Sequence, residues 1–141
     1  MEQYCGINSE KTKYQEGLST HNKKFLYFQL INKTTGEIIG WCGYHTWYTS
    51  HNGAELGYGI YADAHKHLGL MSEAMLPILK SGFEQMNLNR IEAFIGPNNL
   101  PSLNLIKKMN FTQEGKLRAH FIKNNQVEDS LVFSLLKAEF D

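Results

Sequence analysis

The stretch that decides the fold runs from Ala54 to Met75 and reads AELGYGIYADAHKHLGLMSEAM. Its first part alternates like a strand, its middle is a short loop containing Gly69, and its end begins an amphipathic helix. A tight turn before a helix directs several unpaired backbone N–H groups, and the positive end of the helix dipole, at one spot. The stretch therefore predicts a site for phosphate oxygens.

The segment before this stretch reads mainly as strands. Residues 8–18 are polar and predict a short surface helix, whereas residues 25–31 and 37–44 have the aromatic and branched residues of an antiparallel hairpin. Residues 54–61 form a third strand, in which Glu55 and two glycines share the face opposite the apolar side chains. Two glycines on one face leave room for another group to lie against the backbone.

The segment after this stretch alternates helices and strands. Residues 70–87 predict a helix with one buried stripe, and Pro77 inside it is expected to leave the carbonyl of Glu73 unpaired and to kink the helix. Residues 90–95 predict a strand, residues 99–109 a helix capped by Asn99, and residues 112–121 and 127–136 a final hairpin. This order predicts an α+β domain, or mixed α/β, with helices against a mixed sheet.

The bulk properties of the chain narrow its function. Its 141 residues, 42% of them hydrophobic, predict one domain over residues 1–141, and the 14 basic and 14 acidic residues predict no nucleic-acid binding. No apolar run is long enough to span a membrane and the first residues do not resemble a signal peptide, so we expect a cytoplasmic protein. Cys5 and Cys42 are expected to be reduced thiols, and the six histidines follow no metal-binding pattern, so we expect no metal.

Four pieces of the chain, in order, resemble the GNAT acetyltransferases, and most closely their ribosomal-protein N-terminal (Rim-type) branch. The pieces are residues 54–60, 66–74 and 99–111, and residues 114–118 followed by 127–136. The resemblance implies a mostly antiparallel sheet that is splayed at its centre, with helices on both faces. It also implies acetyl-CoA as co-substrate and a primary amine as acceptor, either a protein N-terminal α-amine or a small amine.

The resemblance places the cofactor-binding residues on the loop and the neighbouring strand. The family's phosphate loop falls on Lys66, His67, Leu68, Gly69, Leu70 and Met71, and Ser72 could add a hydroxyl donor. Only Gly69 matches that loop strictly, but the loop binds pyrophosphate mainly through backbone N–H groups. The third strand is expected to carry a bulge, and the backbone of Ile60 and Tyr61 to pair with the pantetheine arm.

The resemblance also suggests which residues carry the chemistry. Glu55 is the expected general base for the attacking amine, with an ordinary surface carboxylate as the alternative. An α-amine requires a weaker base than a lysine amine, because its pKa lies closer to neutrality. Ser102 is the expected partner of the departing thiolate and Asn99 of the pantetheine amide, although both residue types are also ordinary at a helix start.

The first 24 residues depart from the family pattern, in which a further strand and helix precede this point. The strand that normally covers the edge beside residues 25–31 is expected to be missing, and an uncovered apolar edge invites pairing with another chain. We therefore expect a homodimer, or a chain shortened relative to the functional gene product. A non-catalytic acyl-CoA-binding or sensing module stays open as the alternative to an enzyme, because the phosphate loop is degraded.

Overall fold

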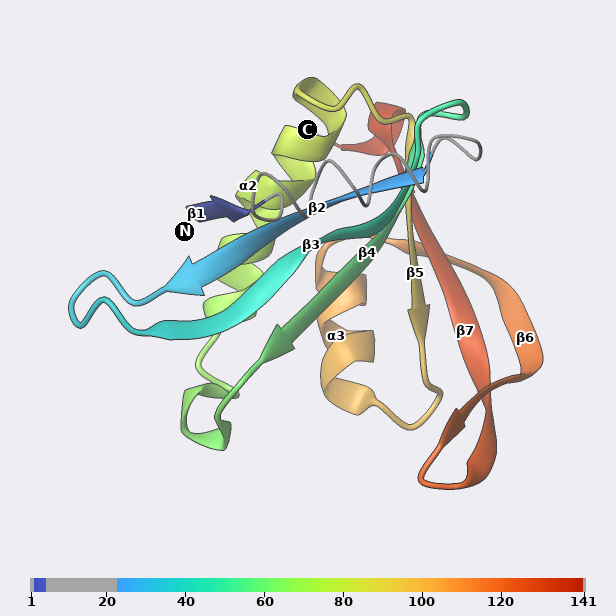
Figure 1. Cartoon of the computed structure of the whole chain (residues 1–141). Coiled ribbons are helices and arrows are strands. Elements are labelled where there is room, and N and C mark those ends of the chain that lie inside the picture. Colours follow the sequence, from blue (N-terminus) through green and yellow to red (C-terminus); the bar gives the residue numbers. More distant parts are fainter. Residues whose placement is uncertain (1, 5–22, 141) are drawn as a thin grey trace.

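A computed structural model describes residues 2–4 and 23–140. The predicted helix at residues 8–18 and Cys5 lie outside the described residues. The strands are β1 (Glu2–Tyr4), β2 (Lys23–Ile31), β3 (Ile38–Tyr48), β4 (Gly53–Ile60), β5 (Arg90–Ile95), β6 (Thr112–Lys123) and β7 (Gln126–Leu136) (Figure 1). The helices are α2 (Leu70–Glu84) and α3 (Leu100–Lys108), with short 3-10 helices η2 (Asp63–His65) and η3 (Lys137–Glu139).

The strands form one mixed sheet in the order β1-β2-β3-β4-β5-β7-β6. Every neighbouring pair is antiparallel except β4 and β5, which run parallel. β4 and β5 pair only from Gly53 opposite Arg90 to Glu55 opposite Glu92, and beyond that point the two strands separate (Figure 1). The α+β fold with a mostly antiparallel sheet splayed at its centre is therefore confirmed.

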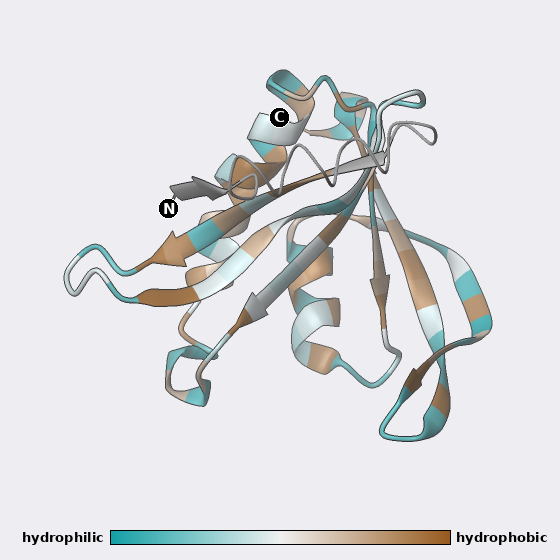
Figure 2. Ribbon diagram, viewed as in Figure 1, coloured by the Kyte–Doolittle hydropathy of each residue, from teal (hydrophilic) through white to brown (hydrophobic). Residues whose placement is uncertain are grey.

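Both described helices cover the same face of the sheet, where the hydrophobic core lies. Cys42, Tyr44, Ala54 and Ile91 are fully buried on this face, and the hydroxyl of Tyr44 donates to the carbonyl of Ile78 in α2 at 2.8 Å. Apolar residues line the strands and both helices, whereas the hairpin tips and the loop before α2 are polar (Figure 2). We expected helices on both faces of the sheet. Within residues 2–4 and 23–140, the α-helices lie on one face only.

The helix boundaries follow local backbone chemistry. α2 begins after Gly69, whose φ of 75° is left-handed, and it continues through Pro77. It ends at Glu84, three residues before the predicted end, where Asn87 has a φ of 57° and Leu88 N–H bonds to Gly82 O at 3.0 Å. A left-handed residue at this position ends a helix by turning the chain back on its last carbonyls. α3 is capped by Asn99, as predicted.

The N-terminal edge of the sheet differs from the expectation. β1 pairs antiparallel with β2, with Glu2 opposite Gln29 and Tyr4 opposite Tyr27. The edge strand that we expected to be missing is thus present as a three-residue strand, and it covers part of β2. The sequence does not reveal this strand, because three residues are too few to set up an alternating pattern.

Two negative findings concern the described part of the chain. No helix there is long and apolar enough to cross a membrane. No group of three or more His, Cys, Asp or Glu side chains in residues 2–4 and 23–140 is placed to hold a metal ion.

Candidate acetyl-CoA site

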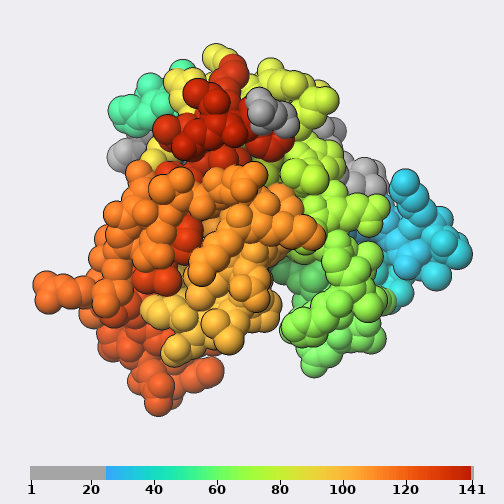
Figure 3. Space-filling model, turned by 180° about the vertical axis from the view of Figure 1, so that it is seen from behind, coloured from blue at the N-terminus to red at the C-terminus, as the bar shows by residue number. Residues whose placement is uncertain are grey.

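A groove of about 710 Å³ lies between the loop before α2, the end of β4 and the start of α3. The space-filling view shows it as a cleft between the side chains of α3 and those of residues 63–72 (Figure 3). Most of the predicted site residues line it together, although they come from three separate segments: Ile60, Lys66, His67, Gly69, Leu70, Met71, Ser72, Asn99 and Ser102. The fold therefore brings the predicted loop, strand and helix start to one place.

The start of α2 forms the floor of one end of the groove. Both His67 and Gly69 have left-handed backbones, with φ of 63° and 75°, so the loop turns sharply into the helix. Gly69 makes no side-chain cap, and the first intrahelical bond is donated by Glu73 N–H to Gly69 O at 3.1 Å. The N–H groups of residues 70–72 precede that bond, and such groups are natural donors to an anion.

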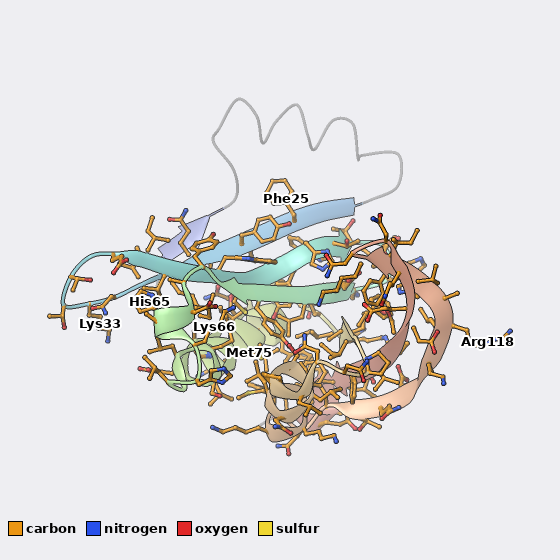
Figure 4. The ribbon with its side chains drawn as sticks, turned by 90° about the horizontal axis from the view of Figure 1, so that it is seen from below. Phe25, Lys33, His65, Lys66, Met75 and Arg118 are labelled. Carbon is orange, nitrogen blue, oxygen red and sulfur yellow. The ribbon has the colours of Figure 1, made fainter. Side chains whose placement is uncertain are left out.

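The side chain of Lys66 is already paired. Its Nζ lies 2.9 Å from Oδ1 of Asp63, and this contact lowers the pKa of the exposed Asp63 carboxyl. Figure 4 shows His65 and Lys66 side by side at the loop, on the helix-bearing side of the sheet. The positive charge expected from Lys66 is therefore shared with a carboxylate, and the loop depends mainly on its backbone donors.

Two predicted cofactor-binding residues are placed differently. The N–H of Tyr61 donates to Ile39 O at 3.0 Å, so this group faces β3 and is not available to a pantetheine arm. Leu68 does not line the groove, and its side chain is 64% exposed. The expectation for the Tyr61 N–H is corrected because successive residues of a strand direct their backbone groups to opposite neighbours.

The groove contains two unsatisfied polar atoms. In the described part of the chain, the buried side-chain atoms without a hydrogen-bond partner are Tyr58 OH and His65 Nδ1, and both residues line this groove. Buried polar groups in proteins are nearly always hydrogen-bonded. Both groups therefore lack a partner among the described residues, at the edge of the groove.

The start of α3 shows that Asn99 has a structural role. Its Oδ1 accepts a hydrogen bond from the N–H of Ser102 at 3.3 Å, which is the geometry of an N-cap. Both side chains also line the groove. Asn99 therefore caps α3, as an ordinary residue at a helix start would. The contacts of Asn99 and Ser102 with a ligand stay predictions.

Glu55 lies on the face of the sheet opposite the helices, where β4 and β5 begin to separate. Its Oε2 lies 3.0 Å from Nε2 of His45, and both side chains are partly buried. The expected bulge is on β3 and not on β4: Tyr44 pairs with Leu56 and Thr46 with Glu55, so His45 is the extra residue. A bulge redirects a side chain locally, and here it directs His45 at the carboxylate.

The two glycines of β4 make room for side chains of β3. A Cβ on Gly57 would meet His45 Cδ2 at 2.5 Å, and a Cβ on Gly59 would meet Trp41 Nε1 at 2.9 Å. The space that we expected a ligand to use is thus filled by the protein's own His45 and Trp41. Gly57 instead lets His45 reach Glu55.

Glu92 is a site residue that sequence reasoning missed. It pairs with Glu55 across the parallel β4–β5 contact, so both carboxylates lie on the same face. Burial raises the pKa of Glu92, Arg90 lowers it, and the nearby Glu55 and Glu114 raise it further. The alternation in residues 90–95 places Glu92 opposite the apolar side of its strand, but only the register shows that Glu55 is its neighbour.

The aromatic residues of β3 and Arg118 of β6 lie in different surroundings. Tyr44 belongs to the core and Trp47 packs against it. Burial raises the pKa of Tyr48, and Glu55 and Glu92 raise it further, which places Tyr48 near the carboxylates. Arg118 points outward from β6 into solvent (Figure 4).

The chain matches the family model described as Acetyltransferase (GNAT) domain over residues 5–112. It belongs to the GNAT family. An uncharacterized N-acetyltransferase from Bacillus licheniformis, p20, is 39% identical over 113 residues, which cover 80% of this chain and 63% of that protein. The chain spans 63 to 66% of the length of three such Bacillus relatives.

Solved structures share the GNAT fold of this chain. The ribosomal-protein-S5-alanine acetyltransferase from Vibrio fischeri has a TM-score of 0.78 at 24% identity, over 94% of this chain and 73% of that one. A spermidine N-acetyltransferase from Vibrio cholerae, solved as a dodecamer, has a TM-score of 0.75 at 19% identity, over 97% and 78%. At these identities the likeness concerns the fold alone.

Proposed function

We propose that this chain transfers an acetyl group from acetyl-CoA to a primary amine by direct attack within a ternary complex. The observation that carries the proposal is the split between β4 and β5, which pair only as far as Glu55 and Glu92. In the proposal this split connects the groove on the helix side with the carboxylates on the other face. A thioester held in the groove would reach an amine presented beside Glu55. The backbone donors of residues 70–72 would hold the pyrophosphate, and the N–H near Ile60 would face the thioester oxygen.

Glu55 is the base in this proposal. An ammonium must lose a proton before it can attack, and a carboxylate at the split is placed to accept it directly or through water. The 3.0 Å contact with His45 Nε2 would orient the carboxylate, because the β3 bulge directs His45 at Glu55 and the absence of a side chain at Gly57 leaves room for it there. Ser102 would contact the departing thiolate from the opposite side of the split.

The acceptor in this proposal is a positively charged amine. Glu55 and Glu114 both lie close enough to Glu92 to raise its pKa, and Arg90 pairs with Glu114. Clustered carboxylates attract a cation and favour its binding. We assign the chain to the Rim-type branch and favour a protein N-terminal α-amine, which needs a weaker base than a lysine amine. The two solved relatives are named as acetyltransferases of a ribosomal protein and of spermidine, and both acceptors carry primary amines.

The test measures binding and catalysis separately. Calorimetry should detect binding of acetyl-CoA, and thiol release should require an amine from a panel of N-terminal peptides, spermidine and small amines. Glu55→Gln should lower kcat by about 10²-fold or more and leave acetyl-CoA binding unchanged. Glu84→Gln, which changes an exposed carboxylate at the end of α2, is the matched control and should keep full activity.

Three outcomes distinguish the alternatives. Thiol release with acetylated amine in mass spectrometry supports the enzyme. Binding of acetyl-CoA without thiol release, together with indifference to Glu55→Gln, supports a non-catalytic acyl-CoA-binding or sensing module. Failure of the full chain to bind acetyl-CoA at all contradicts both.

A further inference from the structure

Tyr58 has the buried hydroxyl that is hardest to explain by folding alone. Its side chain lies on the helix-facing side of β4, opposite Cys42 in the register, and lines the groove. Among the described residues its hydroxyl has no hydrogen-bond partner. By contrast, the buried hydroxyl of Tyr44, one strand away, donates to Ile78 O at 2.8 Å. A buried and unsatisfied hydroxyl lowers stability, so the fold itself gives no reason to keep it.

The side chain of Ser102 lies beside this hydroxyl. Burial raises the pKa of Tyr58 and the adjacent Cys42 adds to this, whereas the neighbouring Ser102 hydroxyl lowers it. The two hydroxyls are close but do not form a hydrogen bond of normal geometry. The Asn99 cap fixes the turn that carries Ser102, so the two hydroxyls face a common space in the groove.

We propose that Tyr58 is a catalytic residue that donates a hydrogen bond to the leaving sulfur of acetyl-CoA, beside Ser102. This inference rests on the proposed function. In the step, the amine nitrogen bonds to the carbonyl carbon, the carbon–sulfur bond breaks, and its electron pair moves to sulfur. The attacking nitrogen is that of the neutral amine. After attack Glu55 takes one proton from the nitrogen and passes it to water, Tyr58 holds the sulfur anion, and the sulfur takes up one proton from water, which leaves an amide and a thiol.

The surroundings of Tyr58 suit this role. A phenol whose pKa is raised stays protonated through neutral pH and remains a hydrogen-bond donor. A donor that is fixed in a partly dry groove needs no reorganisation when charge develops on the sulfur. The segment after Asn99 contains no tyrosine, and the fold supplies one from the adjacent strand instead.

The first test compares Tyr58→Phe with Tyr44→Phe. Loss of a hydrogen bond to a charged group lowers a rate or binding constant about tenfold or more. Tyr58→Phe should therefore lower kcat about tenfold, because the sulfur becomes charged only during the reaction, and change the KM for acetyl-CoA less than about twofold. Because its hydroxyl has no partner, Tyr58→Phe should melt at the same temperature as the parent protein or higher. Tyr44→Phe loses a made hydrogen bond, so it should melt lower and keep its kcat.

The second test is independent of turnover. At pH 9 a thiol with a pKa of about 8.5 is largely ionised, so calorimetry should show that the parent protein binds coenzyme A more tightly than desulfo-coenzyme A. Tyr58→Phe should reduce that preference about tenfold. If Tyr58→Phe keeps the parent's kcat and sulfur preference, this inference is wrong and the proposed function stands. If the parent protein binds no coenzyme A, both are wrong.

Discussion

At the scale of single residues, Glu92 illustrates how the site differs from the rest of the surface. Its pKa is raised by burial and by Glu55 and Glu114, so the folded protein holds the Glu92 proton more tightly than the unfolded chain does. Stability should therefore fall as the pH rises from about the ordinary value of 4.5 through the raised pKa. The ionised Glu92 carboxylate therefore lowers the stability of the folded protein at neutral pH.

We predict that Glu92→Gln raises the melting temperature at pH 7 and flattens its decline between pH 4 and pH 7. The same change should raise the KM for the amine about tenfold, because one charged partner is lost. Glu114→Gln should instead lower the melting temperature at pH 7, because bonding to Arg90 lowers the pKa of Glu114. The stabilisation that the Glu114 carboxylate contributes is lost as the pH falls below its ordinary value of 4.5. Thermal melts from about pH 3 to about pH 7 check both, and a lower melting temperature for Glu92→Gln at pH 7 would contradict the argument.

At the scale of elements, β3 and β4 act together to direct His45 at Glu55. The bulge on β3 adds one residue, and the missing side chain at Gly57 leaves the space that His45 occupies. Bulges are frequent beside active sites because they redirect one side chain without breaking the sheet. Neither strand alone would form this contact.

We predict that Gly57→Ala disrupts the contact and leaves the fold intact. The new Cβ would lie 2.5 Å from His45 Cδ2 and 2.9 Å from Trp41, so these side chains must move, at a cost of about 1–3 kcal/mol in stability. With Glu55 no longer held, kcat should fall about tenfold. Gly53→Ala, in the same strand, would meet only Arg90 O at 3.8 Å and serves as the control. Steady-state kinetics and thermal melts on both variants check this, and equal kcat values would count against a positioning role for His45.

At the scale of the whole molecule, the two edges of the sheet matter for association. β6 forms one edge and β1 the other, and β1 is only three residues long. Edge strands pair readily with other chains unless they are covered. The homodimer that we expected stays a prediction, but β1 reduces the exposed edge on which that expectation was based.

We predict that removing residues 1–4 exposes more of β2 and increases self-association. Light scattering across a concentration series should show a larger average mass for the truncated chain than for the full chain, and its melting temperature at low concentration should be lower. Truncation without any change in mass or melting temperature would mean that β1 does not protect this edge.

Much of the fold could be predicted because neighbouring residues encode it. The alternation in residues 90–95 gave β5 its correct bounds, the Asn99 cap marked the start of α3, and the glycine loop marked the start of α2. These features depend on backbone geometry within a few residues. The groove-lining loop residues were found for the same reason, with Leu68 as the exception.

The sequence by itself determined the order of the elements, the loop that enters α2, and the apolar face of each strand. Only the tertiary structure decided that His45 contacts Glu55, that Glu92 lies beside it, and that Tyr58 faces Ser102. These pairs are separated by 10 to 44 residues along the chain. They depend on strand register, on one bulge, and on how α3 packs against β4, and a local pattern contains no information about which distant segment will become its neighbour.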